Sequence, residues 1–219
     1  MSRTRSYEGD AIEVTFDPAR CIHSEECVHG LPSVFDPDRR PWVDADAAEA
    51  DAIAEVIHRC PTGALAYRRR DGRPEEKAPA EASIRVAADG PLFARGPFRL
   101  RVPGEEEPRE EIRIALCRCG LSEHKPFCDD SHVEGGFEAE AALGTPGKLA
   151  DGEASAEGPI EIVPRENGPL TLDAAVELSD GGSERLRCRR PALCRCGHSA
   201  NKPFCDGSHG DAGFAAEGF

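Results

Sequence analysis

Two stretches of the chain carry the same four metal-binding side chains at the same spacing. Each stretch reads C-x-C, then eight residues, then C-x3-H, and each ligand of the second stretch lies 77 positions after its counterpart. The residues are Cys117, Cys119, Cys128 and His132 in the first stretch, and Cys194, Cys196, Cys205 and His209 in the second. Thiolates and imidazoles at such spacings bind zinc or iron–sulfur clusters. Because an internal repeat decides the architecture before other signals do, the sequence predicts two similar metal-binding modules.

The second stretch ends in Lys202-Pro-Phe-Cys-Asp-Gly-Ser-His209, which resembles the signature of the CDGSH iron–sulfur family, also called NEET proteins. The resemblance implies a [2Fe–2S] cluster with Cys194 and Cys196 on one iron, and Cys205 and His209 on the other. The first repeat implies the same arrangement for Cys117, Cys119, Cys128 and His132. It departs from the family pattern at Asp130, where the second repeat has Gly207. Aspartate tolerates the backbone of a tight turn, but its negative charge argues against equal reduction potentials.

The family resemblance also implies how the two repeats pack. CDGSH units usually pair across a twofold axis, with strands from both units forming a β-cap. Two copies in one chain therefore imply an intramolecular pseudo-dimer within a monomer.

The histidine ligand also affects the chemistry of each cluster. A neutral imidazole carries no charge, so the reduction potential of the cluster should exceed that of an all-cysteine site. Protonation of the ligating nitrogen would break its bond to iron, so these clusters should be lost in mild acid.

The N-terminal region has its own pattern of apolar residues. Alternation over 11–16 and 64–67 predicts two strands. Between them, an apolar face repeats with helical spacing over 47–60, and either Asp44 or Asp46 can cap the predicted helix. The sequence therefore predicts a small β-α-β domain.

A third group of cysteines lies in this domain. It consists of Cys21, Cys27 and Cys60, and proline follows the last of them. The segment resembles divergent mono-cluster [4Fe–4S] ferredoxins and the small [3Fe–4S] ferredoxins of actinobacteria, with Ser24 in place of the usual middle cysteine. Three thiolates favour [3Fe–4S], since a [4Fe–4S] cluster would need a fourth ligand. The candidates are Ser24, His23, His29 and solvent.

The fold class expected is α+β, with one ferredoxin-like domain and two mostly-β CDGSH modules. Charged, proline-containing and alanine-rich stretches predict the linkers. The predicted boundaries are 1–70 for the ferredoxin-like domain, 71–82 for a linker, 83–140 for the first CDGSH domain, 141–158 for a second linker and 159–219 for the second CDGSH domain. Cys188 has no counterpart in the first repeat, and we interpret it as a small core residue.

Charge and composition limit the partners and the compartment. The formal net charge is −14, so we expect neither nucleic acid nor an anionic membrane as a partner. The start of the chain is polar, and no apolar run reaches the length of a membrane span. Because the cysteines occur in ligand spacings, we expect reduced thiols in the cytoplasm rather than disulfides.

These observations predict an electron-transfer protein rather than an enzyme, because no nucleophile–base pair or phosphate loop is recognisable. Its cofactors would be two [2Fe–2S] clusters and one [3Fe–4S] or [4Fe–4S] cluster, and its partner a redox protein. One alternative is a carrier that donates clusters to an apo iron–sulfur acceptor. Another is a structural zinc protein that acts as an interaction module.

Overall fold

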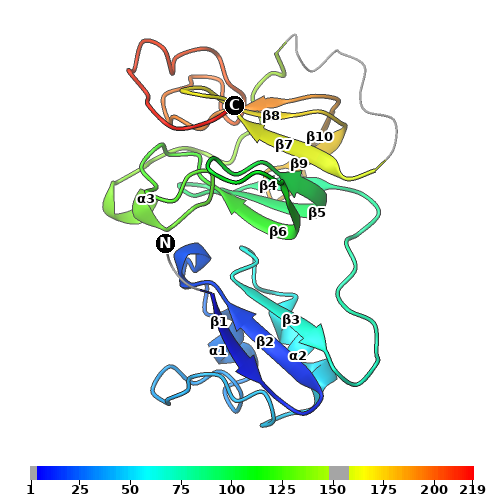
Figure 1. The fold of residues 1–219 in the computed structure, drawn as a ribbon. Coiled ribbons are helices and arrows are strands. Elements are labelled where there is room, and N and C mark those ends of the chain that lie inside the picture. Colours follow the sequence, from blue (N-terminus) through cyan, green and yellow to red (C-terminus); the bar gives the residue numbers. More distant parts are fainter. Residues whose placement is uncertain (1–3, 148–157) are drawn as a thin grey trace. The chain divides into compact units, whose positions relative to one another are not determined.

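The computed structural model describes residues 4–147 and 158–219, and the chain forms two compact units (Figure 1). Unit 1 is Met1–Lys77 and unit 2 is Ala78–Phe219. In the described residues, strands predominate over helices, which agrees with the expectation of mostly-β CDGSH modules. Residues 148–157, which belong to the predicted linker over 141–158, lie outside the described part of the chain.

Unit 1 contains an antiparallel sheet in the order β1-β2-β3. The central strand β2 (Ile12–Phe16) pairs with β1 (Arg5–Glu8) on one side and with β3 (Leu65–Arg69) on the other. Strand β1 was not predicted, because its largely exposed sequence lacks the apolar alternation that marks a half-buried strand. Ile12 and Val14 of β2 point into the core and are fully buried.

Three short helical segments complete the described part of unit 1. They are the 3₁₀ helix η1 (Pro18–Arg20) and the α-helices α1 (Glu26–Gly30) and α2 (Ala50–Ile57). Helix α2 is shorter than the predicted 47–60. Its buried face contains the predicted apolar residues Ile53, Val56 and Ile57. These side chains pack in one core with the inward residues of β2.

Neither carboxylate that was predicted to cap α2 does so. The N-cap position belongs to Glu49, whose side chain makes no capping hydrogen bond. Asp44 instead accepts the backbone N–H of Asp46, and Asp46 accepts the N–H of Asp10 from the β1–β2 turn. The capping prediction was wrong because both carboxylates stabilise turns that precede the helix. After α2 the chain turns, so Cys60 is presented by a turn and not by the helix.

In the described part of unit 2, eight strands form one sheet, with the path β10-β9-β4-β5-β7-β8-β11 and with β6 paired to β5. The first repeat supplies β4 (Ser83–Val86), β5 (Leu92–Leu100) and β6 (Arg109–Leu116). The second repeat supplies β7 (Ile160–Pro164), β8 (Leu170–Leu172), β9 (Val176–Ser179), β10 (Arg185–Cys188) and β11 (Ala192–Leu193).

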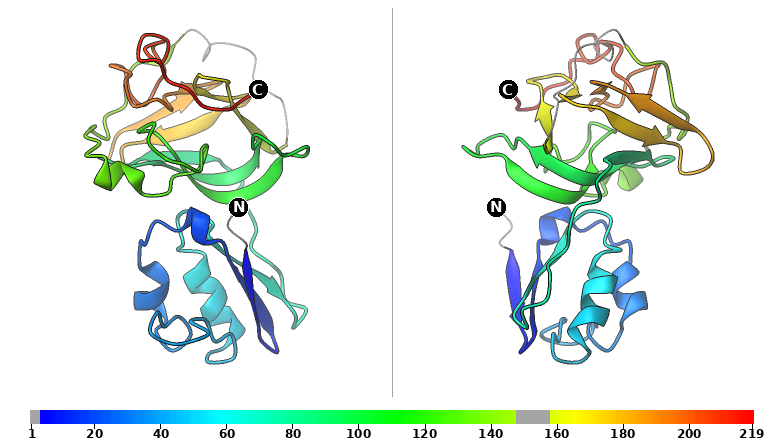
Figure 2. Two further views of the ribbon diagram at one scale, coloured as in Figure 1. Left: turned by 60° about the vertical axis from the view of Figure 1, so that its left-hand side comes forward. Right: turned by 90° about the vertical axis from the view of Figure 1, so that its right-hand side faces the viewer.

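Strands of the two repeats pair reciprocally. Strand β4 runs parallel to β9 with Ile84 opposite Leu178, and β5 runs parallel to β7 with Leu100 opposite Ile162. The same offset of 78 positions separates Ile84 from Ile162 and Leu100 from Leu178, so one pairing repeats the other with the roles of the repeats exchanged. Figure 2 shows these strands of both repeats combined in one curved sheet.

One apolar core lies within unit 2 and draws on both repeats. Alternate residues of β5 are buried, and they pack with apolar residues from β7, β8 and β9. Cys188 is 2% exposed in this core, as predicted, and burial raises the pKa of its thiol. Within the residues that the structure describes, none of the helices has the length and apolar character needed to cross a bilayer.

Candidate metal centres

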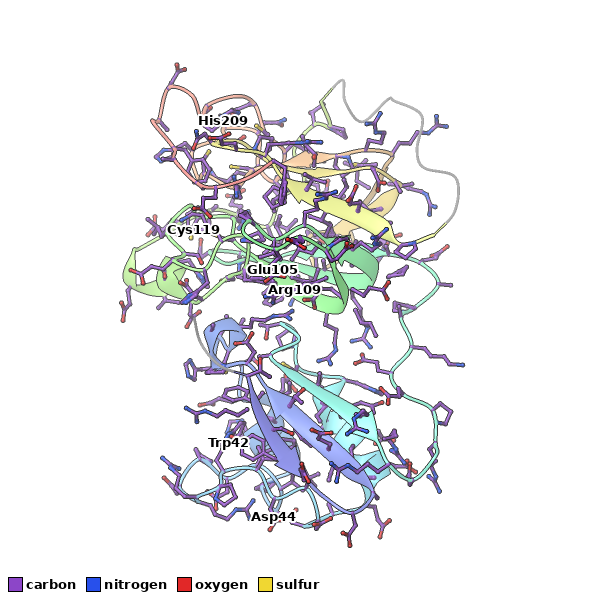
Figure 3. The ribbon with its side chains drawn as sticks, in the orientation of Figure 1. Trp42, Asp44, Glu105, Arg109, Cys119 and His209 are labelled. Atoms are coloured by element: carbon purple, nitrogen blue, oxygen red, sulfur yellow. The ribbon has the colours of Figure 1, made fainter. Side chains whose placement is uncertain are left out.

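Each CDGSH-type loop begins directly at the end of a strand. Strand β6 leads into Cys117, whose N–H donates to the carbonyl of Pro126, and the N–H of Cys128 donates to the carbonyl of Ala115. The second repeat makes the same two bonds, from Cys194 to Pro203 and from Cys205 to Ala192. These bonds hold the two ends of each loop together, which brings the C-x-C pair close to the C-x3-H pair. Figure 3 labels Cys119 of the first loop and His209 of the second.

The ligands of the first loop come together in two pairs. The Sγ atoms of Cys117 and Cys119 are 3.7 Å apart, and Cys128 Sγ is 3.4 Å from His132 Nδ1. In the second loop, the Sγ atoms of Cys194 and Cys196 are also 3.7 Å apart. His132 lies on α3 (Ser131–Glu134), with Nδ1 directed at Cys128 Sγ. Among the described residues, no group of three or more potential ligands converges on one position for a single ion.

Burial makes these thiols reluctant to ionise without a cation. It raises the pKa of Cys128 to about 12 and raises that of Cys205 as well. The hydrogen bond between Cys117 and Cys119 raises the pKa of the first thiol and lowers that of the second. Thiolates are the metal-binding form of cysteine, and a bound cation would stabilise them here. The donor set and its burial therefore fit an iron–sulfur cluster.

A buried arginine stands between the two cysteines of each C-x-C pair. Arg118 is 1% exposed and donates to the carbonyls of Ala87, Gly90, Ala139 and Glu140. Arg195 is equally buried and donates to the carbonyls of Arg165, Gly168 and Glu217. Each guanidinium also lies over an aromatic ring, Phe137 or Phe214 respectively. Each arginine thus ties its cluster loop to the preceding turn and to the segment that follows the loop.

Each of these arginines also interacts electrostatically with a cysteine of the other repeat. Burial lowers the pKa of Arg118, and the Cys194 thiolate opposes this shift. Burial likewise lowers the pKa of Arg195, and Cys117 opposes it. Arginine keeps its charge even so. Neither arginine was predicted as part of the site, although C-R-C-G occurs identically in both repeats and is the sequence signal for them.

The two cluster loops touch through their backbones. A Cβ atom placed on Gly120 would lie 2.6 Å from the carbonyl oxygen of Cys196, and one on Gly197 would lie 2.4 Å from that of Cys119. Both glycines have φ of +84°, a conformation that other residues adopt only with strain. The contact is reciprocal and brings the C-x-C pairs of the two repeats against each other within unit 2.

A serine and an aspartate fix the shape of each loop. The Ser199 hydroxyl donates to the carbonyl of Phe204, and the Asp206 carboxylate accepts the Ser208 hydroxyl and the N–H groups of Ala200 and Ser208. Ser122 and Asp129 make the corresponding bonds in the first loop. Hydrogen bonds from Ser208 lower the pKa of Asp206 to about 2. The loop aspartate therefore stays ionised in mild acid.

In unit 1, Cys21, Cys27 and Cys60 line one cavity of about 560 Å³. Cys21 follows η1 and Cys27 lies in α1. Burial raises the pKa of Cys27 to about 11, and the Cys60 and Cys21 thiolates add to the shift. The three thiols therefore form one electrostatically coupled group. Their donor chemistry and the cavity that they share fit a cuboidal cluster.

The candidates for a fourth ligand differ in whether they line this cavity. His23 and Ser24 line the cavity, whereas the His29 side chain is 77% exposed and pairs with Glu25. Trp42, labelled in Figure 3, lines the cavity and packs its ring 4.9 Å from that of Phe16.

Two cationic side chains that were not predicted from the sequence, Arg5 and Arg40, also line this cavity. Their charge suits an anionic thiolate cluster. The other histidines lie outside the ligand pairs. His58 bonds to Tyr67, His124 contacts Asp129, and His198 is exposed.

Comparison with known proteins identifies both kinds of site. Residues 7–70 match the model of a family described as a divergent 4Fe-4S mono-cluster, and residues 89–133 and 167–210 match the iron-binding zinc finger of CDGSH type. The chain therefore belongs to the iron–sulfur proteins, with one divergent mono-cluster domain and two CDGSH domains. The predicted resemblances to the CDGSH family and to the divergent mono-cluster family are confirmed.

The match to each relative covers part of this chain and most of the relative's own length. Uncharacterized protein YjdI of Escherichia coli (strain K12) is 41% identical over 66 residues, which are 30% of this chain and 87% of that protein. Its counterpart in Escherichia coli O157:H7 gives the same values. No solved structure matches the chain.

Proposed function

We propose that the protein transfers electrons through two His/Cys3-ligated [2Fe–2S] clusters and one ferredoxin-type cluster, without catalysing a reaction of its own. When bound, such clusters accept and release single electrons. The observation that carries this proposal is the reciprocal backbone contact between the C-x-C loops at Gly120 and Gly197. It makes the two CDGSH sites direct neighbours, as one-electron exchange requires. The separation of the first ligand set into a Cys–Cys pair and a Cys–His pair supports two irons over one zinc ion at that site, and the Cys194–Cys196 pair of the second set has the same spacing.

The repeats would serve this function as an intramolecular pseudo-dimer. The reciprocal pairing of β4 with β9 and of β5 with β7 supports that arrangement, because each repeat supplies a strand to the other. The chain would then need no second copy to complete the sites. Its partner would be a protein that donates or accepts single electrons.

Metal analysis of anaerobically purified protein tests the proposal. We expect iron with acid-labile sulfide, a red-brown colour and the low-field EPR signal of an oxidised [3Fe–4S] cluster. Zinc without sulfide in a native preparation would contradict the redox function and leave an interaction module. Transfer of clusters to an apo-acceptor without a redox change would favour the carrier function instead.

We expect Cys60→Ser to remove the cluster of unit 1 and to leave both clusters of unit 2. The reason is that all CDGSH ligands belong to unit 2, whereas Cys60 shares its cavity with Cys21 and Cys27. Iron analysis measures the loss relative to the native protein. A loss of three irons indicates [3Fe–4S], and a loss of four indicates [4Fe–4S] with a ligand such as His23 or Ser24. Loss of iron from all sites would contradict the separate assignment.

Replacing a histidine ligand tests the CDGSH sites. We expect His209→Cys to lower the potential of the second [2Fe–2S] centre and to slow its loss in mild acid, because a thiolate adds negative charge and removes the imidazole. Asp206 cannot account for acid loss in that range. Its lowered pKa means that its stabilising charge is present above the ordinary carboxyl range and disappears only as pH falls towards about 2.

The measurements are a potentiometric titration and the rate of bleaching after a drop in pH. His198→Ala is the matched control, since His198 is an exposed histidine in the same loop. It should change neither quantity. An unchanged potential and an unchanged bleaching rate in His209→Cys would exclude His209 as a ligand.

A further inference from the structure

The two ligand histidines have different surroundings. In the first repeat, His132 directs Nδ1 at Cys128 Sγ, and its far nitrogen Nε2 lies 3.5 Å from Asp130 Oδ1. His132 is 9% exposed, and the turn at Gly90 lies beside the same nitrogen. The far side of this ring therefore faces a carboxylate and the protein. His209 is half-buried, and the residue two positions before it is Gly207.

The backbone beneath this difference is nearly the same in both repeats. Asp130 has φ of +73° and Gly207 has φ of +93°, so both adopt the left-handed conformation. A Cβ atom on Gly207 would have no neighbour within 4 Å. The Asp130 side chain makes no capping hydrogen bond to α3, although it occupies the N-cap position. Its carboxylate is thus the feature that distinguishes the two turns, and it is directed at the histidine.

A carboxylate on the far nitrogen of a ligating imidazole fixes its tautomer and makes it a stronger ligand. A negative charge near a redox centre also opposes the addition of an electron. We propose that Asp130 positions His132 with its proton on Nε2 and lowers the potential of the first [2Fe–2S] centre below that of the second. Electrons from a one-electron donor, which is oxidised by one electron in each step, then occupy the second centre before the first. This inference rests on the proposed electron-transfer function.

The size of the effect follows from the exposure of the carboxylate. The Asp130 side chain is 37% exposed, so water weakens its interaction with the site. We expect roughly a tenfold difference between the centres in the ratio of reduced to oxidised cluster. For a one-electron couple this equals a separation of about 59 mV.

The test exchanges the two residues in the full chain and follows both centres by potentiometric titration with EPR detection at one fixed pH. Asp130→Gly should raise the reduction potential of the first centre, so that the two centres are reduced at similar potentials. Gly207→Asp should lower the higher potential, and the double exchange should restore the separation with the order reversed. Asp130→Asn keeps the size of the side chain and removes its charge, so it should act like Asp130→Gly if charge is the cause.

Glu134→Gln is the matched control, because it removes an exposed charge from α3 two positions beyond His132. It should shift the reduction potential of the first centre much less than Asp130→Asn does. Potentials that stay unchanged in Asp130→Gly, Asp130→Asn and Gly207→Asp would overturn the role of Asp130 while leaving electron transfer intact. A native protein that contains zinc and no sulfide would overturn the proposed function itself, so the two failures are distinguishable.

Discussion

Alanine at position 197 is expected to remove iron from both CDGSH loops, and not only from the loop that it occupies. Its Cβ would lie 2.4 Å from the carbonyl oxygen of Cys119, which belongs to the other repeat. Relief of this overlap must displace the backbone at a ligand of the first site. The left-handed backbone adds its own strain, so the total cost is about 2–5 kcal/mol.

Gly104 provides a closely matched control for this prediction. It has the same φ of +84°, but a Cβ there would have no neighbour within 4 Å. Gly104→Ala should therefore show only the backbone strain, about 1–2 kcal/mol, and should retain both clusters. Iron per chain and the thermal unfolding midpoint measure the difference. If Gly197→Ala lost only the second cluster, or if it behaved like Gly104→Ala, the contact between the loops would not matter for cluster binding.

The local arrangement of the CDGSH sites was predictable because short-range spacing determines it. Cys128 and His132 are four positions apart, and the two cysteines of each C-x-C pair are two apart, so a single turn brings the members of a pair together. The grouping of the cysteines of unit 1 was harder to predict from spacing, because Cys60 is remote in sequence from Cys21 and Cys27. Their resemblance to known ferredoxins predicted the cluster, and all three line one cavity.

Other features depend on contacts that a pattern of polar and apolar residues does not encode. Strand β1 has a polar sequence and owes its conformation to pairing with β2. The capping prediction failed because the Asp44 and Asp46 carboxylates bond to turns, and local preference cannot distinguish a turn from a helix start there. The parallel pairing of β4 with β9 joins residues almost a hundred positions apart, and alternation alone cannot specify a partner strand at that distance.

Arg118 shows how a charged residue can be central to a site and still be overlooked in a sequence. Charged residues are usually exposed, so an arginine between two ligands looks like a solvated side chain. It is buried because four backbone carbonyls and an aromatic ring satisfy it. These acceptors come from segments on both sides of the loop, and only the folded chain brings them together.

Replacement of this arginine is the second substitution with a large expected effect. Arg118→Met should lower the free energy of unfolding of unit 2 by about 3–5 kcal/mol, because four backbone carbonyls, one in a buried and three in partly buried hydrogen bonds, lose their donor. Arg118→Lys should also destabilise, since one ammonium cannot reproduce the planar set of donors. Arg185→Met is the control. Its partner Glu177 lies at 2.8 Å, but the Arg185 side chain is 59% exposed, so the loss should stay below about 1 kcal/mol.

Comparison of Arg195→Met with Arg118→Met distinguishes the anchoring of particular segments from a general loss of stability of unit 2. Arg195 donates to Glu217 in the C-terminal segment, whereas Arg118 donates to Ala139 and Glu140 in the segment that follows the first loop. Limited proteolysis under native conditions should therefore cut Arg195→Met near its C-terminus and Arg118→Met after its first cluster loop. Identical cleavage patterns in the two variants would mean that the arginines stabilise unit 2 as a whole and do not anchor these particular segments.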